Sequence, residues 1–510
     1  MNKSIGIEEK QKAGNREWLA LLSLSIPTML VAIDTSVLYL ALPQLSATLK
    51  ANSAEQLWIM DIYGFMITGF LMIMGNLGDR IGYRKLLTIG SVAFSLAAVI
   101  AAFSPSAYLL IAARAMMGIA GATLMPSALA LIRNIFVNPE ERGTAISIWM
   151  SCFMAGMIIG PLAGGWMLEY FWWGSVFLLD VPVMLVIVFA GRMLLPEYCH
   201  GIKRPIDLTG AIMSLAAILP FIYGLTEISR NNLTVFPVFA AVSGVFFGIA
   251  FIIRERKTSD ALVDFKLFKN HTFRSTLLTM LLTALIMGGV ALFVAQYLQM
   301  VSELSPFKAG LWLIPQAVGM IIGSLIVQSL AKKIKQQIII SVGLSFSFIG
   351  MVLLTYTPVH NGLVWLEAGF VTAVFGASPI LILGTGIIIA SAPPEKAGSA
   401  ASLSETSNQL GVALGVAILG SIGTFVYRAE IIKDLHLVLP ADLLKVAAES
   451  IVSAHSLAHA GNRPEHTQFI AKIKEAYVNG LHMVAAAGAA IFALLTLITG
   501  YNLRHLNTSS

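Results

Sequence analysis

The chain has 510 residues, of which 57% are hydrophobic and only 12% are charged, and its mean hydropathy is +0.81. Such a chain has too little polar surface to cover a soluble globule, so the composition predicts an all-α integral membrane protein with many spans. The formal net charge of +6 does not indicate nucleic-acid binding, because the basic residues are spread over short segments between apolar runs instead of forming one patch.

Fourteen apolar segments are long enough to cross a bilayer as helices. They are expected near 18–43, 55–77, 85–104, 106–133, 143–168, 174–195, 207–229, 233–253, 273–301, 308–331, 336–357, 363–392, 398–427 and 478–503. The first is too long for a cleaved signal peptide, so residues 1–17 are interpreted as a cytoplasmic amino-terminal segment. Lys and Arg gather in alternate segments between the spans, which predicts a multi-pass protein of the cytoplasmic membrane with both termini in the cytoplasm.

An internal repeat divides these segments into two halves. PEERGTAIS at 139–147 recurs as PEKAGSAAS at 394–402, and LWIM at 57–60 recurs as LWLI at 311–314. The first six spans therefore correspond to the last six, in a 6+2+6 order. The predicted domains are a six-helix bundle at 18–195, an inserted helix pair at 207–254 and a second six-helix bundle at 273–503. Parallel halves of this kind are a transporter architecture, with the substrate site where the halves meet.

Charged residues inside the spans are candidates for proton coupling. Asp34, Asp61 and Arg114 lie at similar distances from the outer ends of their helices, which places them at one depth. A buried arginine can hold a nearby carboxylate ionised, and loss of that contact lets the acid take a proton. A permanent structural ion pair gives the same pattern. Asp61 also suits the counter-charge of a cationic substrate, and its two roles stay open.

Two further acids lie in predicted spans. Glu405 has Met150 as its counterpart in the first half, so this acid is not needed for the shared fold. We therefore expect Glu405 to bind a cationic substrate, with a helix-end charge that snorkels to the cytoplasmic face as the alternative. Asp180, next to Pro182, fits a local helix cap as well as a role in transport.

Apolar and aromatic side chains form adaptable walls around flat organic cations. The substrate-binding candidates of this kind are Trp58, Met150, Met154 and Tyr297. In a chain with 22 Met, most such residues belong to the core or face lipid.

Two glycine-containing stretches predict moving parts. GNLGDRIGYRK contributes glycines for a tight turn and charges that pair across helix ends; its candidate gating residues are Gly75, Asp79, Arg80, Gly82 and Arg84. GMIIGPLAGG contributes small residues that let helix backbones approach, with a proline that interrupts the backbone hydrogen bonds; its candidates are Gly156, Gly160, Pro161 and Gly164. A static packing seam and a hinge both explain the second stretch.

The last repeat carries an insertion at about 431–477. Apolar residues recur at helical spacing over 439–460, and GNRP at 461–464 breaks the chain, which predicts an extracytoplasmic helical hairpin. The histidines of this insertion lack cysteine or acidic partners at metal-binding spacing, so no metal is expected.

No GxxxxGK[ST] loop, HExxH pair or GxSxG elbow occurs in the sequence. ATP drive and the common hydrolytic chemistries therefore lack their residues. We expect a secondary transporter and not an enzyme, driven by a proton gradient without a cofactor.

Several motifs resemble those of the major facilitator superfamily. They are GNLGDRIGYRK, Arg114 with Gly118 and Gly121, GMIIGPLAGG, and DTSVLYLALP at 34–43. The fourteen spans, QLWIMDIYGF, SPFKAGLWLIP and the position of Glu405 resemble its fourteen-helix drug:proton antiporters, in particular the quaternary-ammonium efflux pumps of the QacA and SmvA type.

This resemblance implies proton-coupled efflux of lipophilic, mainly cationic compounds by alternating access, from a functional monomer in the bilayer. Where QacA-type pumps carry further acids, this chain has Met320, Ser404 and Gln409, which disfavours efficient handling of divalent cations. Export of lipids, fatty acids or siderophore-like metabolites is the alternative.

Overall fold

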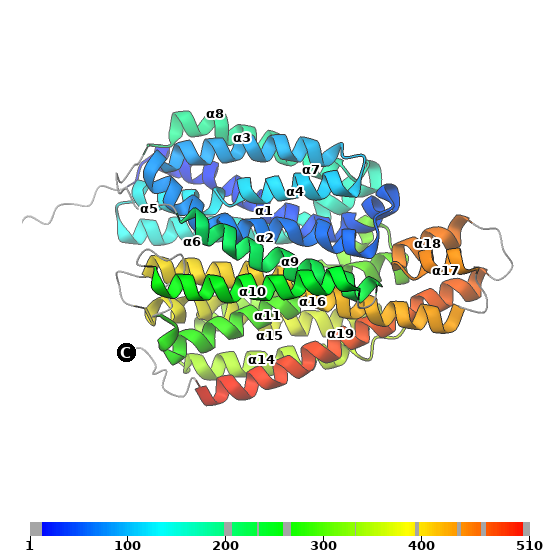
Figure 1. Ribbon diagram of the computed structural model, residues 1–510. Coiled ribbons are helices and arrows are strands. Elements are labelled where there is room, and N and C mark those ends of the chain that lie inside the picture. Colours follow the sequence, from blue (N-terminus) through cyan, green and yellow to red (C-terminus); the bar gives the residue numbers. More distant parts are fainter. Residues whose placement is uncertain are drawn as a thin grey trace, which may run out of the picture.

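The computed structural model describes residues 13–197, 207–231, 234–258, 267–331, 333–392, 397–435, 440–460 and 466–502. Every regular element in these ranges is a helix, and the long helices lie alongside one another in a single bundle (Figure 1). Most of the predicted cytoplasmic segment lies outside the described residues, and the first helix begins inside it, at Asn15.

The first half comprises α1 (Asn15–Leu49), α2 (Ser53–Ile81), α3 (Tyr83–Ala102), α4 (Ala107–Gly121), α5 (Leu124–Ile135), α6 (Pro139–Tyr170), α7 (Ser175–Leu178) and α8 (Asp180–Leu194). Two helices follow, α9 (Leu208–Asn231) and α10 (Val235–Lys257). The second half comprises η1 (Leu267–Lys269), α11 (His271–Gln296), η2 (Tyr297–Val301), α12 (Pro306–Trp312), α13 (Ile314–Leu330), α14 (Gln336–Leu354), α15 (Leu363–Ala390), α16 (Ala397–Leu435), α17 (Ala441–Ala447), α18 (Ile451–Ala460) and α19 (His466–Asn502).

Several helices begin at caps that the sequence encodes. Asn52 accepts a hydrogen bond from the Glu55 N–H, and the Glu55 carboxylate accepts one from the Asn52 N–H, which closes a reciprocal capping box at the start of α2. At the start of α12, the Ser305 hydroxyl accepts a hydrogen bond from the Lys308 N–H, and Pro306 lies in the first turn. These caps fix the loops that turn the chain back into the bundle.

The two halves repeat the same helix contacts. α1 packs against α6 and α11 packs against α16; likewise α3 packs against α8 and α14 against α19. A third pair of contacts corresponds as well, because α2 packs against α4 in the first half and α13 packs against α15 in the second. The internal sequence repeat is therefore matched by a repeat in packing.

Twelve helices in the described part of the chain are long and apolar enough to cross a membrane. Each of the fourteen predicted segments contains a helix, but α2 and α9 are not among the twelve. α9 offers only a shorter apolar stretch, Ile212–Gly224. Some segments are also broken: 106–133 divides into α4 and α5, 174–195 into α7 and α8, and 308–331 into α12 and α13.

The inserted helices lie across the junction of the halves. α9 packs against α2 of the first half and α16 of the second, and α10 packs against α9 (Figure 1). Phe65, Ile222, Ala413 and Ala417 form a small buried cluster of their own where α2, α9 and α16 meet. The inserted pair therefore belongs to the same bundle as both halves.

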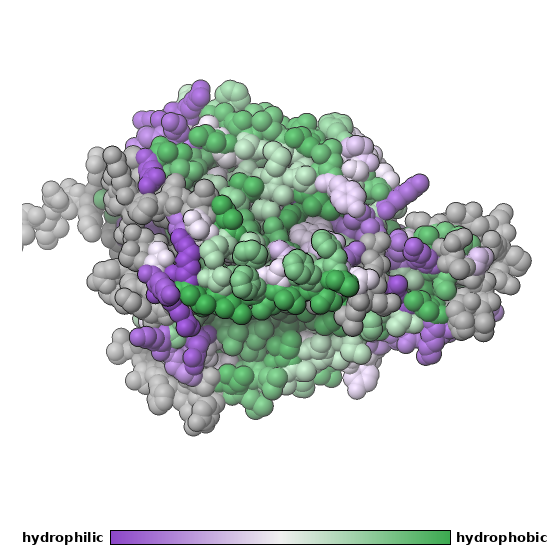
Figure 2. Space-filling model, in the orientation of Figure 1, coloured by the Kyte–Doolittle hydropathy of each residue, from purple (hydrophilic) through white to green (hydrophobic). Residues whose placement is uncertain are grey.

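The outer surface carries a broad hydrophobic band, with hydrophilic side chains gathered toward its ends (Figure 2). α10 illustrates the band, because its large apolar residues are exposed, among them Phe236, Phe239, Val242, Phe246 and Ile249. Such a surface suits lipid and not water.

The insertion at 431–477 differs from the predicted hairpin. The predicted helix over 439–460 is divided into α17 and α18, while the second predicted helix is continuous with the last span as α19. The division has a physical reason, because the Tyr427 hydroxyl binds the Ala447 carbonyl at 3.0 Å and the Ser53 hydroxyl binds the Glu449 carbonyl. The predicted break at 461–464 lies outside the described residues. We call the end of the bundle that carries α17 and α18 the hairpin end (Figure 1).

Candidate functional site

Asp34 and Arg114 form a buried ion pair inside the first half. Arg114 Nη1 donates to Asp34 Oδ2 at 2.9 Å, and both side chains are almost fully buried. Arg114 Nε donates to the Ile59 carbonyl of α2 at 3.3 Å. α1, α2 and α4 thus meet at one guanidinium, and removal of either side chain breaks a buried ion pair.

Aromatic rings complete the surroundings of Arg114. The guanidinium carbon lies 4.7 Å from the Tyr63 ring centroid and 5.9 Å from that of Phe177. Both rings present a negative face that attracts a cation. The two rings therefore help to enclose a guanidinium whose side chain is 1% exposed.

Asp61 lies apart from this ion pair. Its side chain is 2% exposed, and neither carboxylate oxygen has a hydrogen-bond partner among the described residues. The structure therefore does not join Asp61 to Arg114, although both belong to the first half. A buried carboxylate without partners is stable only when a proton or a cation neutralises it.

Asp180 is the acid whose role the sequence left open. It begins α8, is 1% exposed, and lies close enough to Asp34 and Arg114 for both charges to act on it. Hydropathy does not reveal that Asp180 lies near Arg114. The apolar segment 174–195 is interrupted at Leu179, between α7 and α8, and the sequence gives no sign of this interruption.

Glu405 lies in the second half, on α16. It is half-buried and accepts a hydrogen bond from Gln409 Nε2 at 2.9 Å, one turn further along the same helix. The neighbouring Ser404 hydroxyl contacts Thr385 of α15 at 2.9 Å. Glu405 is thus in a polar strip of the second half and does not contact the Asp34–Arg114 pair.

The structure describes two of the four predicted wall residues. Tyr297 is fully buried and its hydroxyl donates to the Pro358 carbonyl at 2.6 Å. Trp58 is half-buried on α2. The side chains of Met150 and Met154 lie outside what the structure describes.

The predicted turn after α2 forms between α2 and α3. Gly82 has φ of 94°, a conformation that glycine adopts without strain, and a Cβ there would meet the Glu197 carboxylate. Arg84 Nε pairs with Glu197 at 3.0 Å, and Arg84 Nη1 donates to the Leu195 carbonyl at 3.2 Å. The turn thus contacts the end of α8.

The other gating candidates of this stretch lie on α2, before the turn. Gly75 has open space around it, Arg80 is exposed, and the Asp79 side chain is not among those that the structure describes.

The glycine stretch of α6 packs directly on α1. A Cβ on Gly156 would lie 2.3 Å from the Met29 carbonyl, and one on Gly160 would lie 1.9 Å from Ser36 Oγ. Gly164 meets Val37 in the same way, and the Pro161 carbonyl approaches Gly310 of α12. This stretch therefore serves as a packing seam within the first half and as a contact between the halves.

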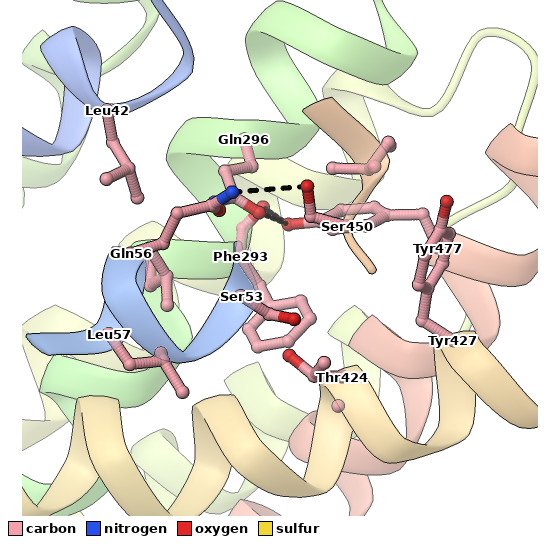
Figure 3. A pocket seen from close by; sticks show the side chains of 13 residues that line it. Leu42, Ser53, Gln56, Leu57, Phe293, Gln296, Thr424, Tyr427, Ser450 and Tyr477 are labelled. Atoms are coloured by element: carbon pink, nitrogen blue, oxygen red, sulfur yellow. Dashed lines mark hydrogen bonds between the residues drawn. The ribbon is translucent and has the colours of Figure 1, made fainter. Parts of the chain in front are cut away.

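The halves are also joined at the hairpin end. Gln299 Nε2 donates to the Leu40 carbonyl at 3.1 Å, and the Ser305 hydroxyl donates to Glu169 at 3.1 Å. Gln56 of α2 donates to the Ser450 hydroxyl, at the edge of a cavity that also contacts Phe293, Thr424 and Tyr477 (Figure 3).

That cavity has a volume of about 30 Å³. Sites for drug-sized ligands are roughly 300–1,000 Å³, so this space holds a water molecule but no organic substrate. At the hairpin end the described residues of the two halves are therefore joined by hydrogen bonds, and this cavity between them is too small for a drug-sized ligand.

Residues 24–416 match the sequence model of the Major Facilitator Superfamily. The chain belongs to the major facilitator superfamily. Membership makes the protein a multi-pass membrane transporter and not an enzyme, in agreement with the all-helical bundle and the twelve apolar helices of the described residues.

Relatives within the superfamily cover almost the whole chain. Multidrug efflux pump LfrA of Mycolicibacterium smegmatis is 35% identical over 499 residues, which are 98% of this chain and 99% of the relative. Methyl viologen resistance protein SmvA of Salmonella typhimurium is 32% identical over 488 residues, which are 95% of this chain and 97% of the relative.

A solved structure shares the fold. It is a bacterial homologue of the human lysosomal transporter Spinster in an inward-facing and unoccupied conformation, with a TM-score of 0.69 and 16% identity. The match covers 96% of this chain and 98% of that one, so the two proteins share a fold over most of both chains.

Proposed function

We propose that the protein is a proton-coupled exporter of lipophilic, mainly cationic compounds, such as quaternary ammonium antiseptics and dyes, and works by alternating access. The observation that carries this proposal is the buried Asp34–Arg114 ion pair in the same half as Asp61, a buried carboxylate without hydrogen-bond partners. The names of two relatives, a multidrug efflux pump and a methyl viologen resistance protein, support the substrate class.

The chemistry follows from the cost of burying charge. A carboxylate in an apolar interior is stabilised by a proton or by an organic cation, and the two compete for it. Asp34, Asp61 and Arg114 are the proposed coupling residues. Exchange then needs no covalent step and no cofactor, because proton uptake from one side displaces the substrate that was bound from the other.

Glu405 is the proposed cation site in the second half, with Trp58, Met150 and Met154 as an adaptable apolar wall. Its half-buried carboxylate and the polar neighbours Gln409 and Ser404 support this role. A single acid in this place favours monovalent cations, since a second positive charge would be buried without a partner.

The proposed topology has fourteen membrane helices in a 6+2+6 order, with a functional monomer in the cytoplasmic membrane. Both termini would face the cytoplasm and the hairpin end would face outward. The basic side chains at the end opposite the hairpin support this orientation, among them Arg84 and Arg254. Contact between the halves at the hairpin end then corresponds to a conformation that admits substrate from the cytoplasmic side.

Ethidium efflux tests the proposal. Cells that express the protein should keep a lower ethidium load than cells without it, and a protonophore should abolish the difference. Efflux that persists after the proton gradient has collapsed would contradict proton coupling. A panel of neutral lipophiles, fatty acids and quaternary ammonium compounds, scored by growth protection, tests the substrate class, and protection against neutral lipids alone would contradict it.

A further inference from the structure

Asp180 is a buried acid that the proposed coupling residues do not include. Its side chain is 1% exposed, and its Oδ2 atom has no hydrogen-bond partner among the described residues. α8 begins without a side-chain cap hydrogen bond, so the helix-cap explanation lacks its contact. An acid buried in this way needs another reason to be there.

The position of Asp180 supplies that reason. Phe177 of α7 faces Arg114 at 5.9 Å, and Asp180 follows it by three residues, close to one helical turn. Asp34 and Arg114 are the charged groups that act on Asp180, from α1 and α4. Tyr63 of α2 is within range of all three charges, and its buried hydroxyl has no hydrogen-bond partner in the described part of the chain.

The cluster therefore contains two carboxylates and one guanidinium. With both acids ionised it carries one excess negative charge in the apolar interior, and one proton makes it neutral. Arg114 is bonded to Asp34 in this conformation, which leaves Asp180 as the acid without the guanidinium hydrogen bond.

We propose that Asp34 and Asp180 share Arg114, so that the site holds one exchangeable proton on whichever carboxylate is not paired. This inference rests on the proposed proton coupling and deepens it. In the present conformation the proton lies on Asp180. A shift of the Arg114 guanidinium from Asp34 to Asp180 moves the proton site from α8 to α1, and a proton leaves Asp180 as one binds Asp34.

Infrared difference spectroscopy of the purified protein tests the arrangement, because a protonated carboxyl has a C=O stretch that an ionised carboxylate lacks. The band that disappears in Asp180→Asn is assigned to Asp180. In Asp34→Asn, where residue 180 is intact, the same band should be lost, because Arg114 becomes available to pair with Asp180. A band that persists in Asp34→Asn, or no band change in Asp180→Asn, overturns the proposal.

Transport measurements separate this proposal from a merely structural role. Asp180→Asn should flatten the pH dependence of dye binding and reduce proton release on dye addition, while Asp180→Glu should restore both. Glu475→Gln, which changes an acid of α19 with 56% of its side chain exposed, is the control and should keep the wild-type profile. An Asp180→Asn variant with a wild-type pH profile contradicts the inference. Failure of the proposed proton coupling itself would be seen in a separate measurement, as efflux by the wild-type protein that a protonophore does not abolish.

If Asp180→Asn does not fold, the Asp34→Asn spectrum compared with wild type still decides the question. If Asp180 did not interact with Arg114, Asp34→Asn would remove at most the band of Asp34 itself. Loss of a further protonated-carboxyl band in Asp34→Asn therefore shows that Asp180 has lost its proton. An unchanged set of protonated-carboxyl bands in Asp34→Asn overturns the shared-arginine arrangement.

Discussion

Gln56, near the start of α2, donates a hydrogen bond to the Ser450 hydroxyl at 3.1 Å, across 394 residues of sequence. The Glu449 carbonyl accepts a hydrogen bond from the hydroxyl of Ser53, which also lies on α2. The Ala447 carbonyl accepts one from the hydroxyl of Tyr427 on α16. One short segment between α17 and α18 thus binds a helix of each half. This segment therefore connects the two halves at the hairpin end.

The first prediction concerns this contact. Ser450→Ala removes one buried hydrogen-bond partner of Gln56, and such a loss costs about 1 kcal/mol. We expect a lower melting temperature for Ser450→Ala and for Gln56→Ala, and less than the sum of the two losses in the double variant. Thr48→Ala removes an exposed hydroxyl that binds within its own helix and is the control. Additive losses would show that the two side chains do not interact in solution.

The second prediction concerns the glycine seams of the two halves. A Cβ on Gly160 would lie 1.9 Å from Ser36 Oγ, a side chain, whereas one on Gly415 would lie 1.9 Å from the Leu285 carbonyl, a backbone atom. Overpacking costs about 1–3 kcal/mol, and backbone cannot rotate away. We expect Gly415→Ala to lower the melting temperature more than Gly160→Ala.

The same pair offers a rescue. Ser36→Ala should restore much of the stability of Gly160→Ala, because it removes the clashing atom. Gly386→Ala is the control, since no atom lies within 4 Å of the added Cβ, and alanine in a helix is favoured by about 0.5–1 kcal/mol. Equal losses in the three alanine variants would contradict the close helix approach.

The third prediction concerns Asp34. Asp34→Asn keeps the shape of the side chain but removes the charge that neutralises Arg114, so gradient-driven efflux should be lost while dye binding remains measurable. The variant should also be less stable, because Arg114 loses the hydrogen bond to Asp34 that it makes in this conformation. The loss should stay below the about 3–5 kcal/mol of a wholly unpaired buried charge, because Asp180 takes over as the partner of Arg114. Efflux and binding are compared in proteoliposomes with and without a pH gradient. Wild-type active efflux by the variant would rule out Asp34 as a coupling residue.

The fourth prediction concerns Glu405. Glu405→Gln removes a half-buried charge and should weaken the binding of a cationic dye by about tenfold, which corresponds to about 1.4 kcal/mol, while a neutral substrate is less affected. Dye affinity is measured in detergent at several pH values. Glu475→Gln, an acid with 56% of its side chain exposed, is the control. Equal affinity and equal pH dependence in wild type and Glu405→Gln would leave Asp34 and Asp61 to fill both roles.

The fifth prediction concerns pH and the inserted helix pair. Burial raises the pKa of Asp207, but hydrogen bonds from Arg254 and the Gly210 N–H, with the Arg254 charge, outweigh it and hold the pKa below its ordinary value. Arg254 binds both carboxylate oxygens, at 2.6 and 2.7 Å. Because the folded-state pKa is the lower one, this stabilisation is present above the unfolded pKa and disappears as the pH falls through the folded pKa. We expect Asp207→Asn to lower the melting temperature at neutral pH and to have little effect in acid. A constant difference across pH would contradict this.

The sequence by itself determined the class of protein and its internal symmetry. Runs of apolar residues leave the backbone no partner but itself in lipid, so helices are the only outcome. The repeat of PEERGTAIS as PEKAGSAAS aligned the halves, and the glycines at 156 and 160 indicated that helix backbones approach closely. Counting residues along helices also placed Asp34 and Arg114 at one depth, and the structure places them in contact.

The tertiary structure decided which faces of the helices meet. α1 and α6 are apolar on all sides, so their sequences carry no periodicity that fixes their rotation. Only the packed bundle therefore separates Asp61 from Arg114, brings Asp180 within range of it, and buries Tyr297 at the hairpin end. The division of 439–460 into α17 and α18 was likewise hidden, because the hydroxyls that bind its carbonyls, on Ser53 and Tyr427, come from distant helices.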